Sequence, residues 1–240
     1  MAPVADSGLP NRMAPVPGAG GEWMVERLRG SAGELHSRPL EVGSRPLWSW
    51  LEVTGPAVVL GGGQDGDVIE RERAERAGVE ICRRRGGGTL VWLDRDSIWF
   101  DVSISSSDPR WETDVGRAFL WLGEFLAGAM GSLGVSADVR TGGLRSGPWS
   151  DLLCFGGLGP GELTVGGRKL VGLSQRRTRA GARFQGVVYP RWRPDALRGL
   201  VDPRSWGGRG IRAADLALGL EDLGLTADDF RRAVDDRLGS

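Results

Sequence analysis

The stretch GGRKLVGLSQRR, residues 166–177, decides how the middle of this chain is organised. Two glycines separate the preceding run ELTV, residues 162–165, from a longer alternating run, and Gly-Gly between two such runs is typical of a tight hairpin. The hairpin carries Lys169, the single lysine among the 31 lysine and arginine residues of the chain. Arginine replaces lysine freely on a solvated face, but not where a compact ammonium must donate to one atom. Lys169 is therefore a candidate catalytic residue, and a solvated lysine on an edge strand is the alternative.

The hairpin strand has two faces, which a regular alternation would divide by residue number. The odd-numbered residues would share one face: Lys169, Val171, Leu173 and Gln175. The even-numbered residues would share the other: Leu170, Gly172 and Ser174. On that second face Gly172 would leave a gap where a ligand or another backbone can come close.

Composition excludes several classes of protein. The 240 residues suit one domain of ordinary size, and 31 basic residues balance 31 acidic ones, which argues against a dedicated nucleic-acid binder. No apolar run approaches the length of a membrane span, and no signal pattern precedes the first elements, so we expect a soluble cytoplasmic protein. Two cysteines, Cys82 and Cys154, with the single histidine, His36, make a poor metal-ligand set. We expect no metal site.

The order of elements favours an α+β fold, with a mixed, mostly antiparallel sheet flanked by helices. Residues 1–21 are rich in proline, alanine and glycine and are expected to be a disordered tail. Residues 22–200 would form the main domain, and residues 22–34 within it suggest a short helix. Residues 201–240 would add a helical extension, with helices over 211–220 and from Thr226, where an acidic capping box begins.

A second motif, RRRGGG at residues 83–88, joins the end of a predicted strand to a glycine turn. Arg84 and Arg85 offer guanidinium forks to a carboxylate or phosphate, and Gly86, Gly87 and Gly88 would let the backbone approach a ligand closely. The pattern suits an anionic ligand. A glycine-rich turn with no ligand is the alternative in a chain with 40 glycines.

A third motif, SDLLCFGGLGPGE at residues 150–162, holds Cys154 in an apolar setting before a loop of glycine and proline. A buried structural cysteine is one interpretation. The other is a nucleophile, which needs a nearby positive charge, and Lys169 on the hairpin could supply it. Cys82 lies within a predicted core strand and is the weaker candidate.

Together these motifs resemble the lipoate–protein ligase and octanoyltransferase superfamily, which also includes the biotin ligases. The resemblance rests on RRRGGGTLV (residues 83–91) followed much later by GRKLVGLSQRR (residues 167–177), and VVLGGGQ (residues 58–64) adds to it. It spans roughly residues 22–200 and implies the catalytic domain fold of the biotin and lipoate ligases.

The resemblance implies a role for each motif. Lys169 would contact the acyl carbonyl and stabilise charge on its oxygen. Residues of the glycine turn and of the hairpin would bind the acyl group or its activating group: Arg84, Arg85, Gly86, Gly87, Gly88, Gly172 and Ser174. The sequence departs from the family pattern at Trp92 and in FQGVV, residues 184–188, where histidines are common. Cys154, fifteen positions before Lys169, resembles the cysteine of those octanoyltransferases that carry the acyl group as a thioester.

The leading hypothesis is an enzyme that attaches a lipoyl or octanoyl group to the acceptor lysine of a lipoyl domain. Its protein partners would be the glycine-cleavage H protein or a 2-oxoacid dehydrogenase subunit, with acyl carrier protein as a possible donor. The first alternative is an ATP-dependent lipoate–protein ligase, which would need ATP and magnesium but not Cys154. A catalytically silent protein that binds acyl groups or lipoyl domains is the second, motivated by the missing histidines. A biotin ligase ranks below these.

Overall fold

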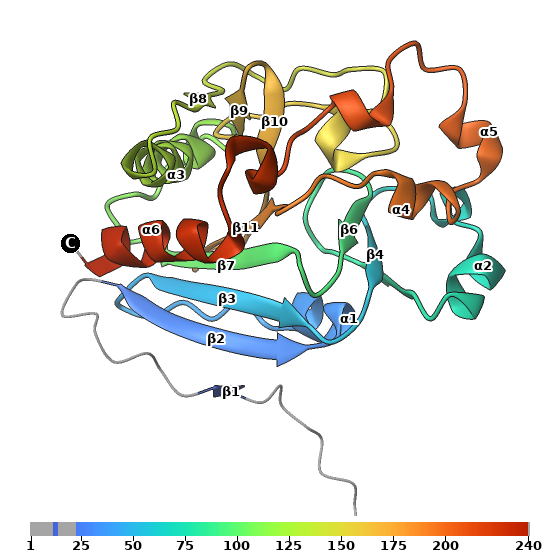
Figure 1. Cartoon of the computed structure of the whole chain (residues 1–240). Helices are drawn as coiled ribbons and strands as arrows, with labels where there is room; N and C mark the ends of the chain where they lie inside the picture. Colours follow the sequence, from blue (N-terminus) through green and yellow to red (C-terminus); the bar gives the residue numbers. More distant parts are fainter. Residues whose placement is uncertain (1–11, 14–22, 240) are drawn as a thin grey trace, which may run out of the picture.

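The computed structural model of this chain describes residues 12–13 and 23–239, which form two β-sheets with helices around them (Figure 1). The larger sheet has eight strands in the spatial order β1 (Arg12–Met13), β2 (Met24–Gly30), β3 (Leu47–Val53), β7 (Ile98–Ser105), β11 (Gly181–Val188), β10 (Arg168–Arg177), β9 (Leu163–Val165) and β8 (Asp138–Val139). The smaller sheet has three, in the order β5 (Glu80–Arg83), β4 (Ala57–Leu60) and β6 (Val91–Leu93). Only the pairs β2–β3 and β4–β5 of these two sheets are parallel. The expected α+β fold with a mixed, mostly antiparallel sheet is confirmed.

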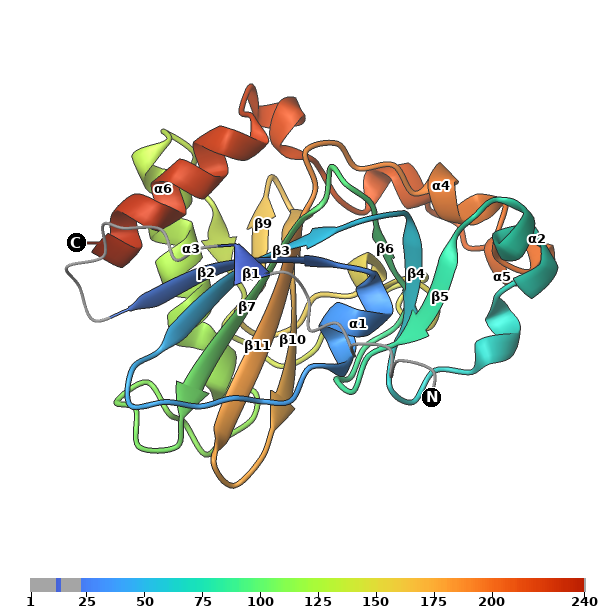
Figure 2. The ribbon, with the colours of Figure 1, turned by 90° about the horizontal axis from the view of Figure 1, so that it is seen from below.

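Most of the helices gather at two ends of the molecule. The described residues form α1 (Ala32–Ser37), α2 (Arg71–Arg76), α3 (Leu120–Ser132), α4 (Asp195–Arg198), α5 (Pro203–Trp206) and α6 (Ala227–Gly239). Shorter 3₁₀ turns are η1 (Gly66–Val68), η2 (Arg117–Phe119), η3 (Cys154–Gly156), η4 (Ala213–Asp215) and η5 (Leu220–Leu223). Figures 1 and 2 show α3 and α6 side by side against the larger sheet, with α2, α4 and α5 near the smaller sheet at the opposite end. None of the helices in the described part is long and apolar enough to cross a membrane.

Each face of the larger sheet packs against a different layer. Strand β7 directs Phe100 toward α3 and α6, where the ring stacks on Trp48 with centroids 4.7 Å apart. Its neighbour Trp99 points to the opposite face, because successive side chains of a strand alternate. There it joins Val59 of β4 and Leu93 of β6 in a second core between the two sheets. The candidate site lies in this space between the sheets.

A β-bulge in β10 overturns the expected division of its faces. The register with β9 shifts by one residue between Lys169 and Val171, so Leu170 is an extra residue on β10. Bulges re-aim side chains and are frequent beside active sites. Lys169 consequently shares a face with Gly172, since a Cβ built on that glycine would lie 3.4 Å from the lysine Cε. The prediction that separated Lys169 from Gly172 and Ser174 is wrong, and all three face the space between the sheets.

The short helix expected over residues 22–34 is also wrong in its first part. Strand β2 occupies most of this range and pairs in parallel with β3. Its alternate residues Glu26 and Leu28 are buried, which is the period of a strand rather than of a helix. The helix α1 starts only at Ala32, after the capping box formed by Ser31 and Glu34.

The helix expected over residues 211–220 is replaced by a single 3₁₀ turn, η4, and an extended segment. The backbone of this segment pairs with β10: the amide of Lys169 donates to the Leu216 carbonyl at 3.1 Å. The amide of Leu218 donates to the Lys169 carbonyl at 3.0 Å. Tertiary pairing with a strand therefore overrides the local helical pattern, and it fixes the backbone of the lysine from outside.

The remaining expectations concern the ends of the chain. Most of the tail expected over residues 1–21 lies outside the described residues, and Arg12–Met13 pairs with β2 as strand β1. The helix expected from Thr226 is confirmed as α6, where the Thr226 hydroxyl accepts from the Asp229 amide at 3.1 Å. The Asp229 carboxylate accepts in turn from the Thr226 amide at 2.9 Å. The division between residues 22–200 and 201–240 stays a prediction.

Candidate active site

The glycine turn after β5 wraps around the guanidinium of Arg84. This side chain is 3% exposed, and its Nε and Nη2 atoms each donate over 2.9 Å, to the carbonyls of Gly87 and Thr89. Gly88 has a φ of +92°, and a Cβ there would lie 2.5 Å from the Arg84 Nη2 atom. Only glycine allows this conformation and this close approach. The motif RRRGGG thus builds a buried cation site.

The buried Nη1 atom of Arg84 has no hydrogen-bond partner among the residues that the structure describes. The guanidinium Nη2 atom lies 3.9 Å from the sulfur of Cys154. A buried charge is costly unless an opposite charge or hydrogen bonds compensate for it. Arg84 is therefore suited to stabilise an anion that forms transiently at or near this sulfur.

The neighbouring Arg85 is exposed, and it is absent from the lining of the two cavities beside Cys154 that are described below. Gly86 is buried against β10, where a Cβ would lie 3.2 Å from the Gln175 carbonyl oxygen. The glycine turn thus packs directly on the hairpin strand. The structure brings Arg84 and the glycines together with Lys169 and leaves Arg85 on the outside.

Cys154 is held at each of its polar groups. Its amide donates to the Leu90 carbonyl at 2.9 Å, and its own carbonyl accepts from Lys169 Nζ at 2.9 Å. The cation at its sulfur is Arg84, whereas Lys169 binds its backbone. Positive charge near this cysteine therefore comes from Arg84, which the expectation did not include, as well as from Lys169.

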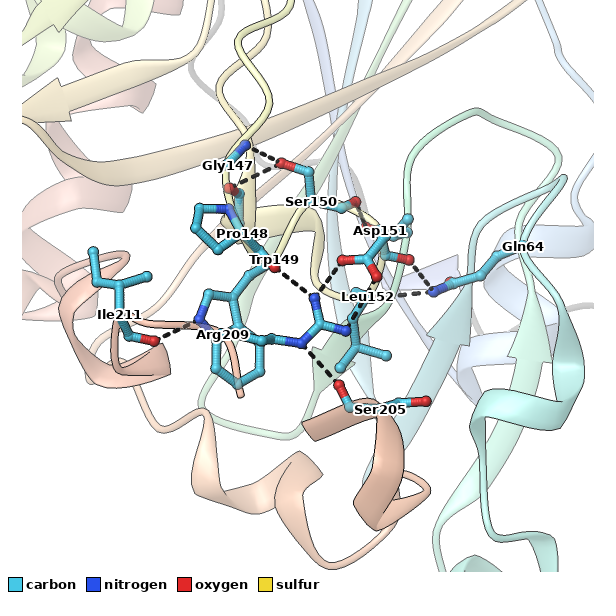
Figure 3. A network of polar contacts seen from close by, with 12 residues as sticks. Gln64, Gly147, Pro148, Trp149, Ser150, Asp151, Leu152, Ser205, Arg209 and Ile211 are labelled. Carbon is cyan, nitrogen blue, oxygen red and sulfur yellow. Dashed lines mark hydrogen bonds and ion pairs between the residues drawn. The ribbon is translucent and has the colours of Figure 1, made fainter. Parts of the chain in front are cut away.

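The loop that leads to Cys154 is fixed by residues far away in the sequence (Figure 3). The Arg209 guanidinium donates to the Pro148 carbonyl and forms an ion pair with Asp151, and it also lies over the Trp149 ring. The Gln64 amide donates to the Leu152 carbonyl at 3.1 Å. The segment after α5 and the glycine loop after β4 therefore position the cysteine together.

Lys169 is buried, with an exposure of 3%, and all of its donors are used. Its ammonium donates to the carbonyls of Cys154 at 2.9 Å and Gly157 at 3.1 Å, and it pairs with a Glu162 carboxylate oxygen at 2.7 Å. It also lies 4.9 Å from the centroid of the Phe155 ring. Three acceptors at this spacing suit the three protons of a compact ammonium, which explains why arginine does not occupy this position.

Glu162 is a site residue that the sequence reasoning missed. Its Oε1 atom accepts from the Leu173 amide at 2.9 Å, and its Oε2 atom accepts from the Gly159 amide at 2.6 Å in addition to the Lys169 pair. The side chain is 5% exposed. The sequence does contain a signal for it: Glu162 is an acidic residue at the end of the glycine-proline loop, seven positions before the only lysine, and could therefore have been expected to pair with it.

Two cavities meet at Cys154. The inner cavity, of about 30 Å³, is narrow and mostly apolar; Val59, Leu93, Trp99 and Val187 are among its lining residues. The outer cavity, of about 300 Å³, reaches Lys169 and Glu162 and opens beside the exposed side chains Val115 and Leu144. Cys154, Leu173 and Ser174 line both. The sulfur therefore stands where a narrow apolar space joins a wider opening.

Gly172 lines the inner cavity, but the gap that it was expected to leave is filled by the Phe155 ring. A Cβ on Gly172 would lie 2.8 Å from Cε2 of that ring. The glycine thus lets Phe155 pack directly on β10 and bring the adjacent Cys154 over the strand. Its role in the structure is close approach of protein to protein.

The residues that line the inner cavity also include His36 and Gln185. Burial, with Arg84 and Arg183 nearby, lowers the pKa of His36 to about 3, so the ring is neutral at physiological pH. The ring lies over Trp99 with centroids 4.4 Å apart, and its Nδ1 atom is 3.3 Å from the Gln185 amide nitrogen. This histidine reaches the cavity from α1, a different element from those where the resemblance predicts histidines.

Trp92 and the segment FQGVV (residues 184–188) of β11, where the sequence departs from the family pattern, have different surroundings; Gly186 is the glycine of that segment. Trp92 points away from the inner cavity, and its indole nitrogen donates to Asp94 at 2.8 Å. At Gly186 a side chain would overlap the Phe100 ring in the core under α3. Phe100 thus takes up the space that a residue at position 186 would need.

The second cysteine has a different environment. Cys82 lies on β5, where burial raises the pKa of its thiol to about 12. It is therefore a protonated thiol under ordinary conditions and a poor nucleophile. Among the residues that the structure describes, no group of three or more histidine, cysteine, aspartate or glutamate side chains could hold a metal ion.

Several known proteins are similar to this chain in sequence or in structure. Octanoyltransferase LipM of Carboxydothermus hydrogenoformans is 29% identical over 135 residues, which are 55% of this chain and 48% of that protein. The chain spans about half the length of the curated relatives that it matches. A Thermoplasma acidophilum structure with bound lipoic acid aligns with a TM-score of 0.67 and 18% identity, covering 90% of this chain and 83% of that one.

The bipartite lipoate protein ligase of Thermoplasma acidophilum, described with its E2 lipoyl domain, aligns with a TM-score of 0.61 and 17% identity, over 81% of this chain and 70% of that one. At these identities the structures establish the fold. Residues 40–217 match the family described as the lipoyl protein ligase A/B catalytic domain, which is most of the chain. This protein belongs to that family.

Proposed function

We propose that this chain transfers an octanoyl or lipoyl group to the acceptor lysine of a lipoyl domain, through a thioester on Cys154. The observation that carries the proposal is the position of the Cys154 sulfur, where the narrow apolar cavity meets the wider opening, 3.9 Å from the Arg84 guanidinium. The likeness to the LipM octanoyltransferases supports the same reaction.

The reaction has two balanced steps. The Cys154 thiolate attacks the carbonyl of an acyl thioester on a carrier, the carbon–sulfur bond to the carrier breaks, and the carrier leaves as a thiol after taking up a proton. The amine of the acceptor lysine then attacks the Cys154 thioester. An amide forms, the amine loses a proton, and the cysteine is released as a thiolate.

The residues of the site divide this work. The aliphatic chain binds along the apolar walls of the inner cavity, which at about 30 Å³ has to widen to admit it, and each CH₂ group buried there gains roughly 0.8 kcal/mol. Arg84 stabilises the thiolate before attack, and the glycine turn holds that guanidinium in place. Ser174 and Gly172 line the inner cavity, where they would contact the acyl group. Lys169 stabilises negative charge on the acyl oxygen.

The proposal implies protein partners and a compartment. The acceptor is a lipoyl domain, of the glycine-cleavage H protein or of a 2-oxoacid dehydrogenase subunit, and acyl carrier protein is the donor. The related bipartite ligase was described with its E2 lipoyl domain, which supports an acceptor of this kind. Both cysteines are free thiols, and a thiol nucleophile needs a reducing compartment such as the cytoplasm.

The donor distinguishes this reaction from that of an ATP-dependent ligase. Intact mass spectrometry of an apo lipoyl domain would be recorded after incubation with the full chain, in one tube with octanoyl carrier protein and in another with lipoate, ATP and magnesium. We expect modification with the carrier alone, together with an octanoyl adduct on the enzyme at Cys154. Modification with ATP alone would instead identify a ligase. No modification in either tube, with retained binding of the lipoyl domain, would indicate a silent binding protein.

Two adjacent arginines provide a matched test of the thiolate partner. Arg84→Gln is expected to slow both transfer and iodoacetamide alkylation of Cys154 by about 10- to 100-fold, the effect of losing one interaction with a charged group. Arg85→Gln removes an equal charge from the exposed neighbour and should change both rates less than about twofold. Peptide mapping after alkylation would measure the rate at Cys154. Equal losses in both variants would contradict a specific role for Arg84.

A further inference from the structure

The ion pair between Lys169 and Glu162 has a feature that the proposed reaction does not account for. The lysine must donate to an acyl oxygen during transfer, yet its three protons already serve the Cys154 carbonyl, the Gly157 carbonyl and the Glu162 carboxylate. One of these partners has to be released. Which one is released follows from the cost of each exchange.

Releasing a backbone carbonyl costs one hydrogen bond, which a substrate oxygen replaces. Releasing Glu162 would separate a buried cation from a buried anion, which is far more costly. The carboxylate is also fixed independently of the lysine, through the amides of Gly159 and Leu173 at 2.6 Å and 2.9 Å. Glu162 is therefore the fixed member of the pair, and the two carbonyls of the cysteine turn are the exchangeable ones.

We propose that Glu162 is a positioning residue, which stays bound to Lys169 while the ammonium exchanges a carbonyl of the turn at residues 154–157 for the acyl oxygen. It acts through Lys169 and does not itself touch the substrate. The outer cavity supports this assignment, because both side chains of the pair line it beside Cys154, so the exchange occurs where the acyl group would arrive. This inference rests on the proposed function and adds a residue to it.

The test is the acylation of Cys154 by octanoyl carrier protein in a single turnover, followed by intact mass spectrometry. Glu162→Gln is expected to slow acylation by about 10- to 100-fold at saturating carrier, with little change in the carrier concentration that gives half the maximal rate. Glu162→Asp keeps the charge and should recover part of the rate. If the glutamine variant does not fold, the aspartate variant carries the test, with an expected rate below that of the wild type.

A double-mutant cycle separates positioning from a structural effect. In a Lys169→Met background, Glu162→Gln should add less than about a twofold loss, because a residue that acts through Lys169 has no effect without it. Glu26→Gln is the matched control: it removes another buried carboxylate, paired with Arg38 at 2.9 Å, and should leave the acylation rate within about twofold of the wild type.

The outcomes for the inference and for the proposed function are distinct. If the wild type forms no Cys154 adduct, the proposed function fails. If the wild type forms it and Glu162→Gln forms it equally fast, only the role of Glu162 is overturned. An equal loss from Glu162→Gln with and without Lys169 would also overturn it, since the carboxylate would then act independently of the lysine.

Discussion

Replacing Cys154 with alanine is expected to lower the rate of acyl transfer by more than about 10³-fold, because the variant cannot form the thioester. The substitution removes only a sulfur atom, and the backbone contacts of residue 154 with Leu90 and Lys169 do not depend on it. The variant should therefore fold and still bind the lipoyl domain. Single-turnover transfer from octanoyl carrier protein, with thermal unfolding recorded in parallel, would measure both properties.

The second cysteine supplies the control for this prediction. Cys82→Ala removes a thiol whose pKa burial raises to about 12, so it should keep transfer within about twofold of the wild type. An enzyme that needs Cys82 and not Cys154 would contradict the proposed nucleophile. Full activity of Cys154→Ala with lipoate and ATP would point to a ligase, in which this cysteine only packs.

The fold, and the placement of the glycine turn beside the hairpin strand, could be predicted because their signals are local. The Gly166-Gly167 turn has positive φ at both residues, as a two-residue hairpin requires, and β10 follows it as expected. The motif RRRGGG predicted the end of a strand and a turn whose backbone lies close to another group. The structure places Gly88 against the Arg84 guanidinium and the Cys154 sulfur. In each case the residue type has few other uses at that position.

The parts that could not be predicted depend on contacts between distant segments. The bulge at Leu170 depends on the register with β9, which an alternating pattern cannot reveal. The segment after η4 is extended because it pairs with the backbone of Lys169, although its sequence suits a helix. Glu162 was missed for the same reason: its contact with the Leu173 amide forms only when the loop that ends at β9 folds back on β10.

The assignment of the two cations shows the same limit within the site. Charge near a cysteine was expected from Lys169, since the hairpin follows the cysteine loop in the sequence. The structure brings the Arg84 guanidinium to the sulfur from the other sheet, and Lys169 binds the carbonyl of the same cysteine. The two cations bind different atoms of one residue, and only the arrangement of the sheets decides which atom each one contacts.

Replacing Lys169 with methionine is expected to cost more than any other single change in the hairpin. Removing one preorganised donor to a developing oxyanion lowers rates by about 10²- to 10³-fold. The change also leaves the Glu162 carboxylate buried without its cation, and breaking a buried pair costs about 3–5 kcal/mol of the free energy of unfolding. Denaturant unfolding and single-turnover acylation would measure the two effects separately. Adding Glu162→Gln should restore part of the stability and none of the activity.

Lys169→Arg tests why this one position is a lysine among 31 basic residues. The variant keeps the positive charge, but a planar guanidinium cannot donate from a single nitrogen to three oxygens at 2.7 to 3.1 Å, as the Lys169 ammonium does. The Phe155 ring, whose centroid lies 4.9 Å from that nitrogen, also limits the space for a larger group. We expect it to be as slow in transfer as the methionine variant, although it should retain more stability. A charge requirement alone would predict near-normal transfer, so activity within about twofold of the wild type would show that the ammonium geometry is dispensable. Loss of transfer in a folded, charged variant would show that the reaction needs the compact ammonium itself.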